Sequence, residues 1–240
     1  MQDATAVTTR MRYARIAGFV YLLLIVLFMS GHFTIDRIVG SGNLAETAKH
    51  IVAGERLYRM ALSVQLLVSV LTVLLAYALY ATLRSVDENL ARMALYWRLG
   101  EAFIGGAVSV LDFATLNLYT DPKYLDVLGP DNLQVALRLA RSAGFASFNI
   151  TATFFSVGST LFFYLFLKSR SIPRVLSALG IFASVVVLFT SLGNLVIPAY
   201  ADVIQFGWAP IFIAEIGTGL WLWARGVKMS VEADPAQPDP

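Results

Sequence analysis

Three charged side chains interrupt an otherwise apolar stretch of this sequence. Arg98, Glu101 and Asp112 lie within the segment Trp97–Leu118, which is long enough to cross a bilayer. Charge inside a membrane is costly, so such residues usually have a partner and often mark an ion or solute path. These three residues are therefore the first candidates for a functional site.

Helical spacing puts these charges on one face. At about 100° per residue, Arg98, Glu101, Gly105, Ser109 and Asp112 fall on a single stripe. We expect the stripe to point into a helical bundle, because lipid-facing charge is disfavoured. Glu101 and Asp112 are about 16 Å apart along the helix axis. They therefore cannot act as a catalytic pair on one atom, but they can mark two levels of one polar column.

A further acid, Glu215, lies in the middle of the last apolar stretch. We expect its depth in the membrane to fall between those of Glu101 and Asp112, and we expect Arg98 to have a carboxylate partner, Glu215 or Glu101. The amides Asn149 and Asn194 complete the candidates for a ligand or ion path.

Small and hydroxyl residues at helical spacing form further polar stripes, which are usually packing and hydrogen-bonding material between membrane helices. The stripes are Gln65, Ser69 and Thr72; Asn149, Thr153, Ser156 and Thr160; and Ser177, Gly180, Ser184, Ser191 and Asn194.

The composition is that of a membrane protein. Hydrophobic residues make up 58% of the 240 residues and charged residues 14%, against about 25% charged in a soluble domain. The net charge of +2 comes with no basic face, so we expect no nucleic-acid partner. Cysteine is absent and neither His32 nor His50 lies deep in an apolar stretch, so we expect no cofactor and no metal site.

The elements that must position these side chains are membrane-crossing helices. Apolar stretches of about 20 residues are long enough to span the bilayer. We predict spans at Ile16–Phe33, Met60–Leu83, Trp97–Leu118, Gly144–Leu167, Arg174–Ile197 and Phe206–Trp223. The predicted fold is an all-α polytopic membrane protein, a six-transmembrane-helix bundle in one domain, residues 1–230. The tail, Val231–Pro240, is rich in proline and acid and should be disordered.

Two longer loops carry signals for short amphipathic helices at one end of the bundle. Asn43 and Glu46 resemble a capping box. Asp121-Pro122 reads as an N-cap followed by proline at the first helical position, with an end at Gly129-Pro130 and a new helix from Asp131. These helices either form a lid over a cavity or simply cover the end of the bundle.

The placement of lysine and arginine predicts the orientation, because cytoplasmic loops carry the excess of these residues. One side has ten, which are Arg10, Arg12, Arg15, Arg84, Arg92, Lys168, Arg170, Arg174, Arg225 and Lys228. The other has seven in longer loops, which are Arg37, Lys49, Arg56, Arg59, Lys123, Arg138 and Arg141. We therefore expect both termini in the cytoplasm.

A set of short motifs in fixed order resembles a known family. They are Ala14-Arg15-Ile16-Ala17-Gly18, Arg98-Leu99-Gly100-Glu101-Ala102, Lys168-Ser169-Arg170-Ser171-Ile172-Pro173-Arg174, and Leu220-Trp221-Leu222-Trp223-Ala224-Arg225 after Glu215. This arrangement, over about residues 10–229, resembles the bacterial membrane family called domain of unknown function 4386. The resemblance implies a multi-helix protein of the bacterial inner membrane and implies no activity. It also suggests that Arg98, Glu101 and Glu215 belong to the family's pattern.

Three hypotheses about function follow from these residues. In the first, a charged intramembrane cavity binds or conducts a small polar or amphiphilic solute, a lipid or an ion. In the second, the protein is structural or regulatory and its buried charges only lock helices together. In the third, it is a cofactor-free intramembrane enzyme, although no HExxH, GxSxG or Ser–His arrangement occurs in the sequence.

Overall fold

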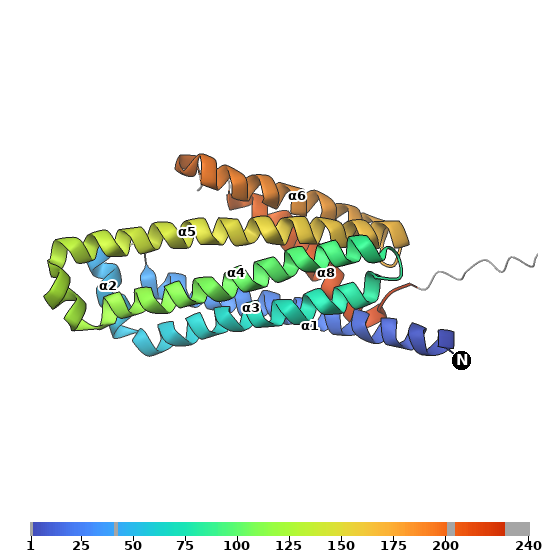
Figure 1. The fold of residues 1–240 in the computed structure, drawn as a ribbon, viewed down its shortest axis with the longest axis horizontal. Coiled ribbons are helices and arrows are strands. Elements are labelled where there is room, and N and C mark those ends of the chain that lie inside the picture. Colours follow the sequence, from blue (N-terminus) through green and yellow to red (C-terminus); the bar gives the residue numbers. More distant parts are fainter. Residues whose placement is uncertain (1, 41–42, 201–204, 229–240) are drawn as a thin grey trace, which may run out of the picture.

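The chain folds into a long bundle of α-helices, seen in a computed structural model that describes residues 2–40, 43–200 and 205–228 (Figure 1). The described part contains no strand. Its α-helices are α1 (Gln2–Val39), α2 (Leu44–Ala53), α3 (Glu55–Leu83), α4 (Glu88–Thr120), α5 (Pro122–Ser169), α6 (Arg174–Val196) and α8 (Ala209–Arg225). The short 3-10 helices η1 (Pro198–Tyr200) and η2 (Gln205–Trp208) lie between α6 and α8. The predicted disordered tail lies outside the described residues.

Five of these helices are long and apolar enough to cross a membrane, within the part of the chain that the structure describes. They are α1, counted from Val7, α3, α4, α5 and α6. The helix α8 coincides with the sixth predicted span but has only 17 residues. The expected all-α class is confirmed. Five of the six predicted spans correspond to these five helices, whereas the sixth corresponds to α8, which is too short to be counted with them.

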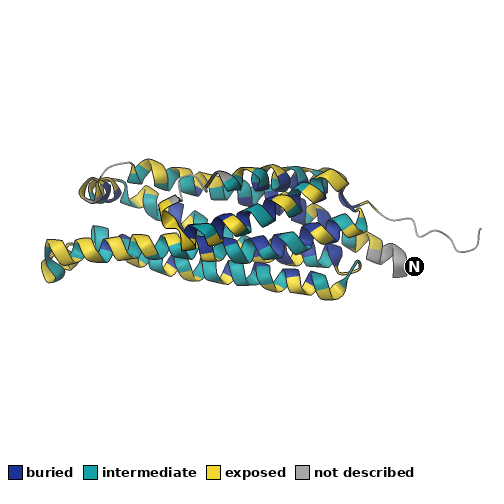
Figure 2. Cartoon of the chain, turned by 90° about the horizontal axis from the view of Figure 1, so that it is seen from above, coloured by how far each residue is buried: buried dark blue, intermediate teal, exposed yellow. Residues whose placement is uncertain are grey.

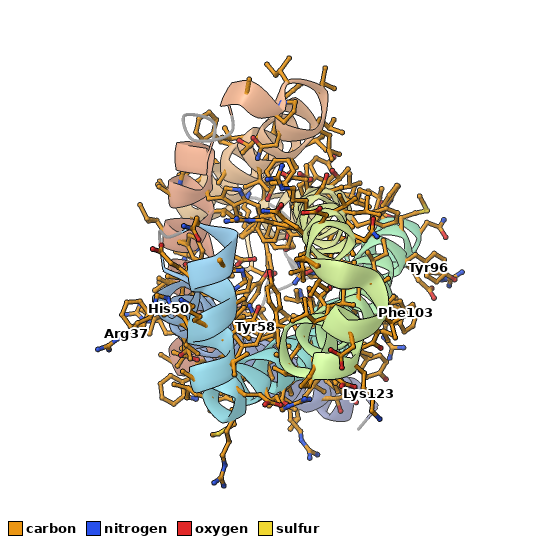
Figure 3. All side chains as sticks on the ribbon, turned by 90° about the vertical axis from the view of Figure 1, so that its left-hand side faces the viewer. Arg37, His50, Tyr58, Tyr96, Phe103 and Lys123 are labelled. Atoms are coloured by element: carbon orange, nitrogen blue, oxygen red, sulfur yellow. The ribbon has the colours of Figure 1, made fainter. Side chains whose placement is uncertain are left out.

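The long helices form a closed ring, in which α1 packs against α3, α3 against α4, α4 against α5, α5 against α6, α6 against α8, and α8 against α1. Large apolar side chains point away from the ring, including Phe103, which is 66% exposed, and Phe189, which is 70% exposed. Figure 3 shows Tyr96 and Phe103 pointing outward from α4. An apolar exterior of this kind matches a lipid environment.

The helix ends follow from local sequence signals. The predicted capping box is present, since Asn43 Oδ1 accepts from the amide of Glu46 at 3.0 Å and Glu46 Oε2 accepts from the amide of Asn43 at 3.1 Å. Asp121 caps α5, whose first residue is Pro122. Both signals satisfy backbone amides that have no partner within the first helical turn.

The helix that was expected to start at Asp131 is not separate from the fourth predicted span. It runs on without a loop to Ser169 as part of the 48-residue helix α5. The predicted break at Gly129-Pro130 is present as a kink, where Gly129 has φ 70° and ψ 167°. Glycine tolerates this positive φ, and Pro130 then fits the first turn of the following helix because it needs no amide partner there. The chain changes direction at this point (Figure 1).

One end of the bundle, which we call the basic end, brings together the first part of α1, the short loops and the end of α8. The Arg10 side chain donates to the backbone oxygen of Thr82 at 2.9 Å and to Ser171 Oγ at 3.1 Å. Lys168 Nζ donates to Asp87 Oδ2 at 2.9 Å, and this hydrogen bond lowers the pKa of the Asp87 carboxyl. The ends of α1, α3, α4, α5 and α6 therefore meet here.

Candidate functional site

A cavity of about 580 Å³ lies inside the ring. It is lined by side chains from α1, α3, α4, α5, η2 and α8, and none from α6. The lining includes Tyr21, Phe28, His32, Asp36, Tyr58, Gln65, Ser69, Thr72, Arg98, Glu101, Gly105, Ser109, Asp112, Phe148, Phe155, Trp208 and Glu215. Its volume is in the range of small-molecule sites, roughly 300–1,000 Å³.

All four charged candidates from the sequence line this one cavity. Arg98, Glu101 and Asp112 lie on the face of α4 where the helical spacing puts them, and Glu215 reaches the cavity from α8. Glu215 is near enough to Arg98 and Glu101 for electrostatic interaction with both. The fold therefore brings together residues that are more than one hundred positions apart in the sequence.

Arg98 has the carboxylate partner that the sequence predicted, and it is Glu101. Arg98 Nη1 lies 2.9 Å from Glu101 Oε2, and the side chains are 3% and 15% exposed. The same nitrogen lies 3.4 Å from Ser159 Oγ, and the guanidinium carbon lies 4.7 Å from the centre of the Phe155 ring. Arg98 is thus held by an ion pair within α4 and by two contacts to α5.

A glycine on α5 makes room for the Arg98 side chain. A Cβ atom at Gly158 would lie 2.8 Å from Arg98 Cγ and 3.2 Å from the backbone oxygen of Ala94. The methylene stem of Arg98 therefore passes directly over this glycine. The close approach of α4 and α5 at this point fixes the depth of the guanidinium in the bundle.

Four polar side chains of the cavity each have an inaccessible atom with no hydrogen-bond partner among the described residues. These atoms are Gln65 Oε1, Arg98 Nε, Glu101 Oε2 and Glu215 Oε1. Glu101 Oε2 is close to Arg98 but is not aligned for a hydrogen bond. Buried polar atoms are nearly always satisfied by protein, water or a ligand. Four of the nine atoms of this kind among the described residues thus belong to side chains that line one cavity.

Aromatic rings form one wall of the cavity. Ring centres are 6.1 Å apart for His32 and Phe148, 5.4 Å for Phe148 and Trp208, and 6.3 Å for Phe155 and Trp208. The chain of contacts ends at Arg98, whose guanidinium lies over Phe155. This aromatic wall runs along the cavity and links side chains of α1, α5 and η2.

The cavity is closed toward the basic end by a packed core. Leu79, Leu83, Ala94, Phe162 and Phe166 are all at most 1% exposed, and Figure 2 shows buried residues gathered in this part of the bundle. No cavity residue lies closer to the basic end of α4 than Arg98.

The opposite end of the cavity reaches accessible residues. Asp36 lines the cavity and is exposed, and Tyr58 and Asp112 are partly exposed. Figure 3, viewed from the α2 end, places Tyr58 between α2 and α5. The cavity is therefore a blind pocket that opens away from the basic end, with Arg98, Glu101 and Glu215 deep inside it.

The two asparagine candidates lie outside this cavity. Asn194 Nδ2 donates to Asn149 Oδ1 at 3.0 Å, and Asn149 Nδ2 donates to the backbone oxygen of Phe145 at 2.9 Å. Neither residue is among the cavity lining. They join α5 to α6, which is the packing role usual for polar residues between membrane helices.

Several cavity residues were not among the sequence candidates. Gln65, Ser69 and Thr72 were interpreted as packing residues, yet all three line the cavity. His32 was considered only in excluding a metal site, yet it lines the cavity and its ring contacts the amide of Gln65. Trp208 was not a candidate either, and it also lines the cavity. The polar stripe on α3 could have indicated these residues. However, the sequence alone does not show which helices α3 packs against, so it does not show that the stripe faces the charged residues of α4.

The described residues offer no metal site, because no group of three or more His, Cys, Asp or Glu side chains converges there. In comparisons with known proteins, the family model described as Domain of unknown function (DUF4386) matches residues 16–226. No curated protein and no solved structure matches the chain. The resemblance noted from the sequence motifs is thereby confirmed.

Proposed function

The chain belongs to the family Domain of unknown function (DUF4386), whose name assigns no activity, and we propose that it binds a small polar or amphiphilic solute in its intramembrane cavity. The observation that carries this proposal is the blind cavity, in whose lining four polar side chains each have one buried atom without a hydrogen-bond partner. A site of this kind, concave and largely apolar with a few convergent polar groups, is the usual form of a small-molecule site.

The same geometry favours binding over open conduction. A conducting path must reach both membrane surfaces, whereas fully buried side chains such as Leu83 and Phe166 fill the bundle between the cavity and the basic end. Passage of the solute across the membrane would require those side chains to separate. The proposed role is therefore that of a binding protein, or of the binding step of a transporter in a state closed at the basic end.

The membrane arrangement that accompanies this function has six crossings. Helix α8 has 17 residues and would measure about 25 Å, near the short end of what spans a hydrocarbon core of about 30 Å. With six crossings both termini share the basic end, and the excess of lysine and arginine there supports a cytoplasmic location for that end in the bacterial inner membrane.

A purely structural role for the charges has one supporting observation, the contacts of Arg98 with Ser159 and Phe155 on α5. However, the ion pair itself joins residues of the same helix, Arg98 and Glu101, so it does not lock two helices together. A locking role also gives no reason for the unpartnered oxygen of Glu215. Solute binding accounts for the ion pair within one helix and for the unpartnered oxygen of Glu215.

Filling the cavity should prevent the protein from carrying a solute. Ser109 is 6% exposed and lines the cavity, so Ser109→Phe places a ring inside it. The small molecules released from purified protein can be identified by mass spectrometry. We expect the wild-type protein to release a polar or amphiphilic compound in stoichiometric amount, and Ser109→Phe to release little or none.

The adjacent residue provides a matched control. Val110 is 71% exposed on the outer face of α4, so Val110→Phe adds the same ring toward lipid and should leave the released compound unchanged. If all three proteins release no compound, or release the same compound in the same amount, the proposed function is wrong.

A further inference from the structure

We propose that the solute is an organic cation with an apolar body, such as a lipophilic amine, whose ammonium group pairs with Glu215. This inference rests on the proposed function, because it names the chemical class that the same cavity would take. Three features of the cavity support this inference. They are the excess of acidic side chains in its lining, the lack of an ion pair at Glu215 among the described residues, and the aromatic wall.

The cavity lining contains more acidic than basic side chains. Four carboxylates line it, those of Asp36, Glu101, Asp112 and Glu215, against the single guanidinium of Arg98. An excess of buried negative charge is unfavourable unless a proton or a cation compensates it. The lining therefore provides a counter-charge for a cation and opposes the entry of an anion.

Glu215 is the carboxylate available for such a cation. Glu101 already pairs with Arg98 at 2.9 Å, whereas Glu215 has no ion pair in the described part of the chain, and its Oε1 atom is inaccessible and unbonded. The Glu215 side chain as a whole is partly exposed, so a solute cation in the cavity would pair with its carboxylate through a charge-assisted hydrogen bond. Gln65, whose Oε1 is also unpartnered, is a further polar residue of the cavity lining.

The aromatic wall suits the apolar body and the charge of the same molecule. The rings of Phe148, Trp208 and Phe155 are in successive contact along the cavity. Aromatic faces attract ammonium groups by the cation–π interaction, with tryptophan the strongest, and they also bury apolar surface. The Arg98 guanidinium over Phe155 is one such cation that the wall already holds.

A bare metal ion fits the cavity less well than an organic cation. Metal ions such as Ca²⁺ need about six to eight oxygen ligands at short range, and no convergent group of three acidic or histidine side chains occurs among the described residues. A cavity of about 580 Å³ also leaves far more room than one ion requires. An amine with a ring or a short chain uses both the space and the wall.

The test compares three probes of similar size and different charge, which are phenylbutylamine, phenylbutanol and phenylbutyrate. Binding is measured by isothermal titration calorimetry on the full-length protein in lipid nanodiscs, after subtraction of the partition into empty nanodiscs. We expect the amine to bind about tenfold or more tightly than the alcohol, and the carboxylate to bind least.

Variants identify the group that recognises the charge. Glu215→Gln keeps the shape and removes the charge, so it should reduce amine affinity about tenfold or more and leave alcohol affinity unchanged. Glu88→Gln makes the same substitution at an exposed position on α4, outside the cavity, and should change neither affinity.

Each other result overturns the inference. Equal affinity of the three probes for the wild-type protein excludes cation recognition, and unchanged amine affinity in Glu215→Gln excludes Glu215 as the group that pairs with the cation; both results leave solute binding in place. If the amine does not bind at all, the inference is also wrong, and the comparison of Ser109→Phe with Val110→Phe then decides separately whether the proposed function fails with it.

Discussion

Replacing Arg98 with methionine is expected to lower the free energy of unfolding by about 3–5 kcal/mol, the usual loss when one partner of a buried ion pair is removed. Methionine preserves much of the unbranched stem that passes over Gly158 and under Phe155, so the change is mainly one of charge. Glu101, which is 15% exposed, then either stays ionised without a partner or takes up a proton, and both states are less favourable than the pair. Unfolding of the purified protein by denaturing detergent measures the difference.

The same helix provides the control for this result. Arg92 Nη2 lies 2.6 Å from Glu88 Oε1, in a pair whose side chains are 46% and 58% exposed. Exposed pairs of this kind contribute about 0–1 kcal/mol, so Arg92→Met should have little effect. The double variant Arg98→Met with Glu101→Gln should recover much of the lost stability, because neither charge remains. Equal losses for Arg98→Met and Arg92→Met would contradict the description of Arg98 as a buried, paired charge.

Gly18→Ala is expected to lower the free energy of unfolding by about 1–3 kcal/mol or more, as overpacked substitutions do. A Cβ atom at Gly18 would lie 2.3 Å from the backbone nitrogen of Trp223 and 2.7 Å from the backbone oxygen of Gly219. Because these are backbone atoms, no side-chain rotation relieves the clash, and α1 and α8 must separate. The displacement also moves Glu215, so solute affinity should fall together with stability.

A second helical glycine separates this steric effect from the effect of alanine itself. A Cβ atom at Gly106 on α4 would have no heavy atom within 4 Å. Gly106→Ala should therefore stabilise the protein by about 0.4–1 kcal/mol, because alanine lowers the conformational entropy of the unfolded chain. Thermal unfolding of both variants gives the comparison. If they change stability in the same direction and by the same amount, the close crossing of α1 and α8 is not present in the folded protein.

Much of the fold could be predicted because long apolar segments in a membrane can only be helices. The predicted end of the second span at Leu83 and the start of the fifth at Arg174 coincide with the ends of α3 and α6. The joined helix α5 could not be predicted as one element, since Gly129-Pro130 is a strong stop signal in any sequence. The sequence predicts a new helix from Asp131, but it does not show that this helix continues without a loop into the fourth span and as far as Ser169.

The candidate site was predictable where a single helix determines it. The spacing of Arg98, Glu101 and Asp112 defines a face of α4 without knowledge of its neighbours. The contribution of α3 depends on which helices are adjacent, so Gln65 was indistinguishable from a packing residue until the ring order was known. The same limit applies to Asn149 and Asn194, whose mutual hydrogen bond removes them from the cavity.

We infer that the charged stripe of α4 lines a solvated cavity that is closed at the basic end. Because the sequence contains no cysteine, a single introduced thiol can measure this directly. A single thiol can be introduced as Ser109→Cys, and its labelling by a charged, membrane-impermeant methanethiosulfonate reagent followed from each side of the membrane. Two further variants set the limits of labelling. Val110→Cys, on the lipid-facing side of α4, sets the lower limit. Val127→Cys sets the upper limit, because Val127 is 82% exposed and lies at the end of the bundle opposite the basic end.

We expect the thiol of Ser109→Cys to be labelled from the side opposite the basic end and not from the basic end, and an amine that occupies the cavity to protect it. The thiol of Val110→Cys should stay unlabelled from both sides. If the thiol of Ser109→Cys is as inert as that of Val110→Cys, the cavity is dry and the charges are structural. If it is labelled equally from both sides, the cavity is an open path and not a blind pocket.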